Sequence, residues 1–222
     1  GNTSTQTQTV IVEDVTAPVP TVETLPTITG ECSAEVTAPT AMDNCEGMII
    51  GTTEDPLTYT EQGTYTINWI FDDGNGNTST QTQTVIVDDI TAPVPTLETL
   101  PTIKGECSAE VTAPTATDNC EGTITGMTTD PISYTELGTY TITWTYDDGN
   151  GNMATQTQTV IVEDVTAPVP TLETLPTISG ECSAEVTAPT ATDNCEGTVT
   201  GTTEDPTSYN EQGTYTITWT FD

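Results

Sequence analysis

The chain has 222 residues, of which 33% are hydrophobic, and it carries 34 acidic residues against one basic residue, Lys104, for a net charge of −33 at pH 7. This charge excludes nucleic acid and anionic lipid as direct partners, because both are bound through Lys and Arg. The sequence has no histidine and its serines lack a partner base, so we expect no enzyme. No apolar stretch is long enough for direct membrane insertion.

The sequence repeats with a period of 75 residues and without insertion or deletion. Cys32, Cys107 and Cys182 share one register, and the three tryptophans share another. A fixed period of this length indicates tandem copies of one small domain. The expected organisation is the last strand of a preceding repeat over residues 1–13, repeat 1 over 14–88, repeat 2 over 89–163, and repeat 3 over 164–222, which lacks its last strand.

The incomplete units at the two ends are expected for a segment cut from a much longer repeat protein. An alternative is strand addition between molecules, in which residues 1–13 complete repeat 3 of another copy. The strand that one end lacks is present at the other end.

The elements of repeat 2 can be taken in chain order. Ile90 to Pro95 predicts an extended edge segment, because two prolines stand within three residues. The Gly- and Asn-rich segment 147–152 predicts a hairpin loop. Strands are expected over 97–103, 106–111, 123–128, 132–135, 139–146 and 154–162, with a loop over 113–122.

The clearest strand alternates strictly between large and small side chains. Tyr140, Ile142, Trp144 and Tyr146 share one face, predicted to be buried, and threonines share the other. No stretch has helical periodicity. Short strands at regular spacing predict an all-β chain of tandem Ig-like antiparallel β-sandwich repeats, arranged end to end.

Each repeat holds two cysteines in a C-x12-C pattern. An even, regular set predicts one disulfide within each repeat, which stabilises by roughly 3 kcal/mol and implies an oxidising compartment. Free thiols are the alternative, and zinc is disfavoured because the chain has neither histidine nor a CxxC motif. The predicted pairs are Cys32 with Cys45, Cys107 with Cys120, and Cys182 with Cys195.

Acidic and amide side chains gather in three segments of each repeat: its entry, the loop before the second cysteine, and the last hairpin. In an Ig-like sandwich these segments lie at one end, where their oxygens could bind calcium. Ordinary turn formation is the alternative, because Asp, Asn and Gly favour turns. The candidate calcium ligands are Glu13, Asp14, Asp43, Asn44, Asp72, Asp73, Asn75, Asp88, Asp89, Asp118, Asn119, Asp147, Asp148, Asn150, Glu163, Asp164, Asp193 and Asn194.

The strings CSAEVTAPTATDNC, GTYTITWTYDDGNGN and TVIVED resemble hyalin-type (HYR-like) Ig-fold repeats of Bacteroidetes surface adhesins, including flavobacterial gliding adhesins. The resemblance covers all three copies. It implies type IX secretion, extracellular display on the outer membrane, and a filamentous stalk. This chain departs from the family at Gln81 and Gln156, where such repeats carry a cysteine in the last strand.

We therefore expect a structural stalk segment of a large secreted bacterial cell-surface adhesin. Its expected partners are neighbouring repeats of the same long chain, with surface polysaccharide or gliding machinery engaged through other regions. The alternative is that the repeats themselves bind a ligand such as polysaccharide or ice, because their Thr-x-Thr rows resemble those of ice-binding proteins.

Overall fold

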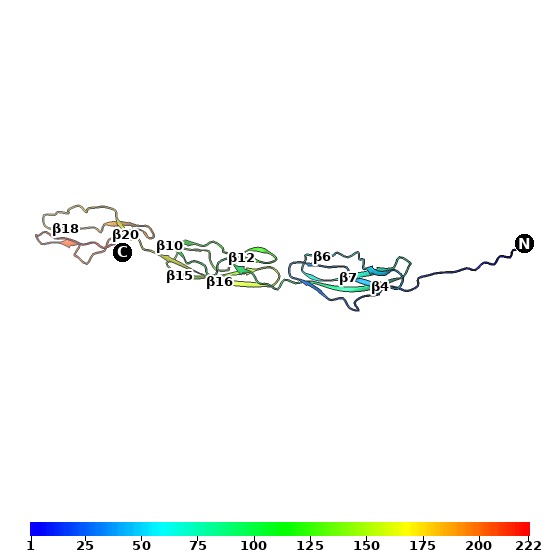
Figure 1. Ribbon diagram of the computed structural model, residues 1–222. Coiled ribbons are helices and arrows are strands. Elements are labelled where there is room, and N and C mark those ends of the chain that lie inside the picture. The colour runs from blue at the N-terminus through cyan, green and yellow to red at the C-terminus, as the bar shows by residue number, and fades with distance from the viewer. The chain divides into compact units, whose positions relative to one another are not determined.

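The computed structural model describes residues 1–222 and contains only strands, turns and loops (Figure 1). It holds no helix with the length and apolar character needed to cross a membrane. Contacts divide the chain into two compact units. The first unit comprises Gly1–Thr96, Thr115–Ile124 and Tyr146–Ala154, and the second comprises Leu97–Pro114, Thr125–Thr145 and Thr155–Asp222.

Repeat 1 lies in the first unit and shows the architecture of the repeat. Its three sheets have the orders β1-β4-β5, β2-β8-β7 and β3-β6. All of their pairings are antiparallel except that of β2 with β8. The strands are β1 (Val19–Pro20), β2 (Ile28–Gly30), β3 (Ala34–Glu35), β4 (Thr40–Asp43), β5 (Gly47–Ile50), β6 (Thr58–Tyr59), β7 (Gly63–Asp72) and β8 (Thr78–Val87).

Repeat 2 has the same three sheets as repeat 1, and repeat 3 has two of them. Repeat 2 has the sheet orders β13-β12-β9, β10-β16-β15 and β11-β14, and repeat 3 has β17-β19-β20 and β18-β21. Their strands are β9 (Val94–Pro95), β10 (Ile103–Glu106), β11 (Ala109–Glu110), β12 (Thr115–Asp118), β13 (Gly122–Thr125), β14 (Ser133–Tyr134), β15 (Gly138–Asp147), β16 (Met153–Glu163), β17 (Val169–Pro170), β18 (Ala184–Glu185), β19 (Thr190–Asp193), β20 (Gly197–Thr200) and β21 (Ser208–Tyr209). The predicted all-β, Ig-like repeat architecture is confirmed.

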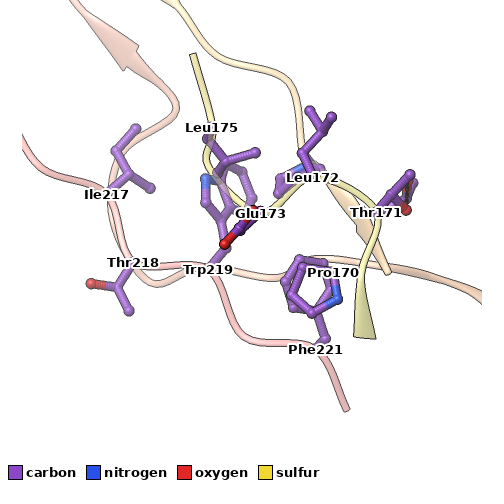
Figure 2. Close-up of a pocket in the computed structure, with 12 residues that line it drawn as sticks. Pro170, Thr171, Leu172, Glu173, Leu175, Ile217, Thr218, Trp219 and Phe221 are labelled. Atoms are coloured by element: carbon purple, nitrogen blue, oxygen red, sulfur yellow. Dashed lines mark hydrogen bonds between the residues drawn. The ribbon is translucent and has the colours of Figure 1, made fainter. Parts of the chain in front are cut away.

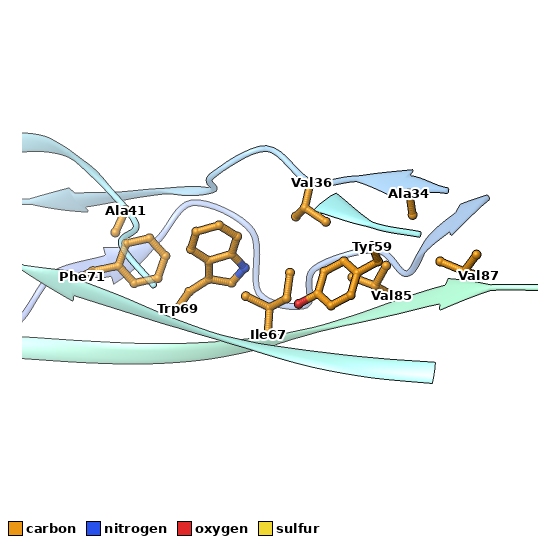
Figure 3. Packing of buried hydrophobic residues seen from close by; sticks show 9 residues of the cluster. All are labelled: Ala34, Val36, Ala41, Tyr59, Ile67, Trp69, Phe71, Val85 and Val87. Carbon is orange, nitrogen blue, oxygen red and sulfur yellow. The ribbon is translucent and has the colours of Figure 1, made fainter. Parts of the chain in front are cut away.

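The core of repeat 1 centres on a row of large side chains on β7, against which residues of β3, β4, β6 and β8 pack (Figure 3). Ile67, Trp69 and Phe71 are buried there because alternate residues of a strand point to the same face. The Trp69 Nε1 group donates a hydrogen bond to Gln83 Oε1 at 3.1 Å, and Gln83 Nε2 donates to the Pro26 carbonyl at 3.0 Å. The predicted alternation in repeat 2 is confirmed, since Ile142, Trp144 and Tyr146 are buried in the same way.

Two predicted elements of repeat 2 are wrong. The segment 97–103 is not a strand up to residue 102, and β10 begins only at Ile103. The predicted loop over 113–122 contains β12. The inward residues of β12 are Ala116 and Asp118, a small side chain and a charged one, so the strand lacks the large alternating residues that would reveal it.

Repeat 3 has no counterpart of the sheet that β2, β8 and β7 form in repeat 1. Residues 1–13 are exposed and form no strand, although they match 76–88 at every position except the last. The segment 76–88 contains β8, which covers the side of β7 in repeat 1. Repeat 3 has a groove of about 630 Å³, lined by Leu172, Leu175, Ile217, Trp219 and Phe221 (Figure 2).

Candidate functional site

The disulfides join neighbouring repeats. Cys32 is bonded to Cys120 in the first unit and Cys107 to Cys195 in the second, each across 88 residues of sequence and with Cα atoms 5.0 Å apart. The predicted pairing within each repeat is therefore wrong. Cys45 and Cys182 are exposed free thiols.

The reason for the different pairing lies in the length of the sandwich. Cys45 lies beside Asp14, near the loop that precedes β8, and Cys32 follows Gly30, which pairs with Val87 at the far end of β8. A ten-residue strand spans roughly 30 Å, whereas a disulfide needs Cα atoms about 5–6 Å apart. The two cysteines of one repeat therefore stand at opposite ends and face different neighbours.

The Glu31 carboxylate connects three segments around the first disulfide. Its Oε2 atom accepts hydrogen bonds from Asn119 Nδ2 at 2.8 Å and from Thr91 Oγ1 at 2.7 Å. Gln62 Oε1 accepts a bond from the Asp89 amide at 2.8 Å, and Gln62 Nε2 donates to the Glu31 carbonyl at 3.0 Å. The junction is thus held by both covalent and polar contacts.

The second junction repeats the carboxylate contacts around Glu106, whereas Leu137 stands at the position of Gln62. A hydrogen bond from Thr166 lowers the pKa of Glu106; desolvation opposes this change, and Asn194 adds a further hydrogen bond. Thr166 and Asn194 are the counterparts of Thr91 and Asn119. The pKa of Glu106 consequently lies below its ordinary value, and the ionised carboxylate is the form that the junction favours.

The last hairpin is organised by Asp148. Its Oδ1 atom accepts hydrogen bonds from the amides of Asn150, Gly151 and Asn152 at 2.8, 3.1 and 3.0 Å. Desolvation acts to raise the pKa of Asp148, but bonds from the Asn152 side chain and the loop amides outweigh it and hold the pKa below its ordinary value. Asn152 Nδ2 also donates to the Asp89 carbonyl at 2.9 Å, which ties the hairpin to the entry segment.

A second feature of the junction is a pair of buried carboxylates. Asp89 and Asp118 are 3% and 5% exposed. One carboxylate oxygen of each lies within 4.8 Å of the other, together with Cys120 Sγ. The Asp118 Oδ1 atom accepts bonds from the amides of Cys120 and Glu121, whereas its Oδ2 atom is buried and has no partner. The chain's one basic side chain, Lys104, pairs instead with Glu163 at 3.4 Å.

The candidate calcium ligands make three different kinds of contact in the structure. Asp72 and Asp147 cap their own turns through the amides of Gly74 and Gly149. Asn44, Asn119 and Asn194 donate to cysteine sulfurs. The carboxylates brought together are Asp14 with Asp43, Asp89 with Asp118, and Asp164 with Asp193.

Glu31, Gln62 and Thr91 take part in the junction and were not predicted from the sequence. One signal for Glu31 was present, because a glutamate precedes the first cysteine in every copy, at Glu31, Glu106 and Glu181.

Residues 88–162 match the family model of the HYR-like domain with four cysteines. This segment is similar to HYR-type repeats. It contains only Cys107 and Cys120, so each repeat here has half the cysteines in the family's description. Gln156 stands in the last strand, where the resembling repeats carry a cysteine. Its Nε2 atom donates to the carbonyls of Leu97 and Glu98 at 2.7 and 3.1 Å, and thereby ties the strand to the entry loop without a covalent bond.

Two curated relatives are similar along almost the whole chain. Hyalin of Strongylocentrotus purpuratus is 34% identical over 240 residues, covering 96% of this chain and 20% of that protein. Hyalin of Lytechinus variegatus is 31% identical over 249 residues, covering 100% of this chain and 47% of that protein. The chain therefore spans between a fifth and a half of these relatives. These similarities support a hyalin-type repeat, and the link to flavobacterial adhesins stays a prediction.

Among solved structures, the ectodomain of human desmocollin-1 is similar with a TM-score of 0.26 and 14% identity, covering 79% of this chain and 46% of that one. A TM-score this low carries no argument about function.

Proposed function

We propose that this chain is an extracellular, adhesion-type stalk segment whose repeats carry tension through their disulfides. The observation that carries the proposal is the pairing of Cys32 with Cys120 and of Cys107 with Cys195. Disulfides also support a location outside the cytoplasm, since reducing compartments do not maintain them. The similarity to HYR-type and hyalin repeats supports the structural role.

The two disulfide-closed loops overlap. The first runs from Cys32 to Cys120 and the second from Cys107 to Cys195, so both contain the segment 107–120. A covalent path therefore leads from Cys32 through the first disulfide to Cys120, back along the chain to Cys107, and through the second disulfide to Cys195. This path avoids most of repeat 2.

The shorter path limits how far the chain can extend. Cys32 and Cys195 are 163 residues apart in sequence and would separate by about 550 Å in a fully extended chain. Along the disulfide path only the 13 residues from Cys107 to Cys120 intervene, which allows about 55 Å. Under load, unfolding of repeat 2 would add little length, and the stalk would keep its reach.

Single-molecule stretching of the 222-residue chain between its ends tests this proposal. The oxidised chain is expected to reach a contour of about 250 Å, and the same chain under a reductant about 750 Å. The Cys120→Ser variant, which opens only the first loop, should lie between them, and Cys45→Ser is the matched control and should behave as the parent chain. An oxidised chain that extends to the full contour would refute the covalent path.

A more specific role, as the stalk of a bacterial adhesin, is part of the same proposal and is supported by the resemblance to flavobacterial repeats. In it, the stalk belongs to a large bacterial adhesin of the kind of the gliding adhesin SprB, is exported by type IX secretion, and is displayed on the outer membrane. Neighbouring repeats are its immediate partners, and surface polysaccharide or gliding machinery is contacted by other regions. Isolated repeats that bind polysaccharide or ice would favour the ligand-binding alternative over the stalk.

A further inference from the structure

We propose that calcium binds between Asp89 and Asp118, two buried aspartates at the junction of repeats 1 and 2, and at the equivalent position one period earlier, where Asp43 is buried and Asp14 half-buried. This site goes beyond the stalk function and does not depend on it. In the junction between repeats 1 and 2 the ligands are Asp89, Asp118 and Asn150. The same set recurs one period earlier as Asp14, Asp43 and Asn75. Both sets lie in the first unit.

The carboxylate oxygens of these two aspartates make fewer hydrogen bonds than they could accept. Asp118 Oδ2 is buried with no hydrogen-bond partner, in a side chain that is 5% exposed. Asp89 Oδ1 accepts the Thr91 amide at 3.1 Å, and Asp89 Oδ2 has a long contact of 3.4 Å from Asn150 Nδ2. Turning the Asn150 amide by 180° would present its oxygen to the same point and add a third hard ligand.

The unpartnered oxygen recurs at the same position of repeat 1, where Asp43 Oδ2 is also buried without a partner. Asn75 Nδ2 lies 3.4 Å from Asp14 Oδ2 and 3.4 Å from Glu46 Oε1, so a further carboxylate approaches this copy of the site. Buried polar atoms are normally paired, and three side-chain atoms here are not: Gln81 Oε1 and the two equivalent aspartate oxygens. The recurrence of the aspartate oxygen at one position of two repeats indicates a missing partner of one kind there.

The charge at the site identifies that partner as a cation. Two carboxylates within 4.8 Å repel each other in a buried environment, and Lys104 is engaged with Glu163. Backbone amides already occupy Asp118 Oδ1, which leaves Oδ2 for a metal. A cation would therefore complete the coordination of Asp118 and offset the repulsion from Asp89.

The ligand chemistry favours calcium over other metals. Calcium takes six to eight hard oxygen ligands in a flexible geometry, and water can complete a set of carboxylate and amide oxygens. Cys120 is in a disulfide and offers no thiolate, so the Asp89–Asp118 site lacks the soft ligand that zinc prefers, whereas the free Cys45 lies beside the Asp14–Asp43 site. Magnesium demands a stricter octahedron at shorter distances, which an irregular site from three loops does not match.

Calorimetric titration of the oxidised 222-residue chain with calcium chloride, and separately with magnesium chloride, tests the site. We expect two saturable calcium equivalents per chain, at Asp14–Asp43 and at Asp89–Asp118, with at least tenfold weaker magnesium binding. Asp164 and Asp193 have no counterpart of Asn150 in this chain and should bind more weakly. No saturable uptake at millimolar calcium would overturn the proposal.

Matched variants show which residues bind each calcium equivalent. Asp118→Asn keeps the shape of the side chain but removes its charge, and it should lose one equivalent; Asp43→Asn with Asp118→Asn should lose both. Asp147→Asn, an acidic residue that caps its own turn, is the control and should keep both. Two free thiols per chain in each variant verify that the disulfides remain. Unchanged stoichiometry in Asp118→Asn, or an equal loss in Asp147→Asn, contradicts the assignment.

Discussion

At the scale of single residues, the repeat depends on polar side chains that complete a small core. Gln83 is 5% exposed and satisfies two groups at once, the indole of Trp69 and the carbonyl of Pro26. The same pair occurs as Trp144 with Gln158. From the sequence alone, a glutamine in a strand otherwise rich in threonine is expected to face solvent. The burial of Gln83 is therefore seen only in the structure.

Replacing Gln83 by methionine should destabilise repeat 1. Methionine fills a similar volume but leaves the Trp69 indole N–H and the Pro26 carbonyl without partners, which costs about 1–3 kcal/mol of unfolding free energy for a buried group. Denaturant unfolding followed by tryptophan fluorescence measures the loss. The exposed neighbour Thr80, changed to valine, is the control and should stay within about 0.5 kcal/mol of the parent. Equal stability of the two variants would contradict the role of Gln83.

The junction carboxylates make stability depend on pH. Glu106 and Asp148 have pKa values lowered in the folded state, so their contribution is present above the unfolded pKa and is lost as pH falls through the folded one. Unfolding free energy should therefore decrease from about pH 5 downward. Glu106→Gln should flatten this decrease, because glutamine does not titrate. Parallel profiles for parent and Glu106→Gln would show that Glu106 contributes nothing.

At the scale of elements, the sequence predicts the strands that side-chain periodicity reveals. It does not predict contacts that depend on how far apart residues lie in space. The alternation correctly predicts β15 and the burial of Ile142, Trp144 and Tyr146, whereas Tyr140 is only half-buried. The C-x12-C spacing is short in sequence, yet the strands between the two cysteines separate them in space. The acidic segments do converge in part, because Asp89 and Asp118 meet, but the role of Glu31 requires knowing which loops face each other.

The disulfide pairing gives a direct prediction. Cys120→Ser should raise the number of free thiols per denatured, unreduced chain from two to three and lower the unfolding free energy. The chain-entropy estimate for a loop of this length is roughly 4.5 kcal/mol. Cys45→Ser is the control: it should lower the thiol count to one and leave stability unchanged, because Cys45 is free and exposed. Zero free thiols in the parent chain would instead favour pairing within each repeat.

At the scale of the whole molecule, the open groove of repeat 3 and the unpaired segment 1–13 complement each other. Val85 and Val87 of β8 are buried in repeat 1, and their counterparts Val10 and Val12 are 78% and 93% exposed. The groove beside Trp219 holds the apolar surface that such a strand would cover (Figure 2). A strand from one chain that enters the groove of another would form a head-to-tail contact, which propagates and does not close.

The 222-residue chain should therefore associate as its concentration rises. Light scattering during size-exclusion chromatography is expected to show dimers and longer species, because each added strand buries apolar surface and pairs backbone groups. The Val10→Asp/Val12→Asp variant places charge on the inward face of the strand and should remain monomeric. The Thr5→Asp/Thr7→Asp variant places the same charge on the outward face of the strand. It tests whether added charge alone prevents association. A parent chain that stays monomeric at high concentration would exclude the exchange and leave the groove to a strand supplied from elsewhere.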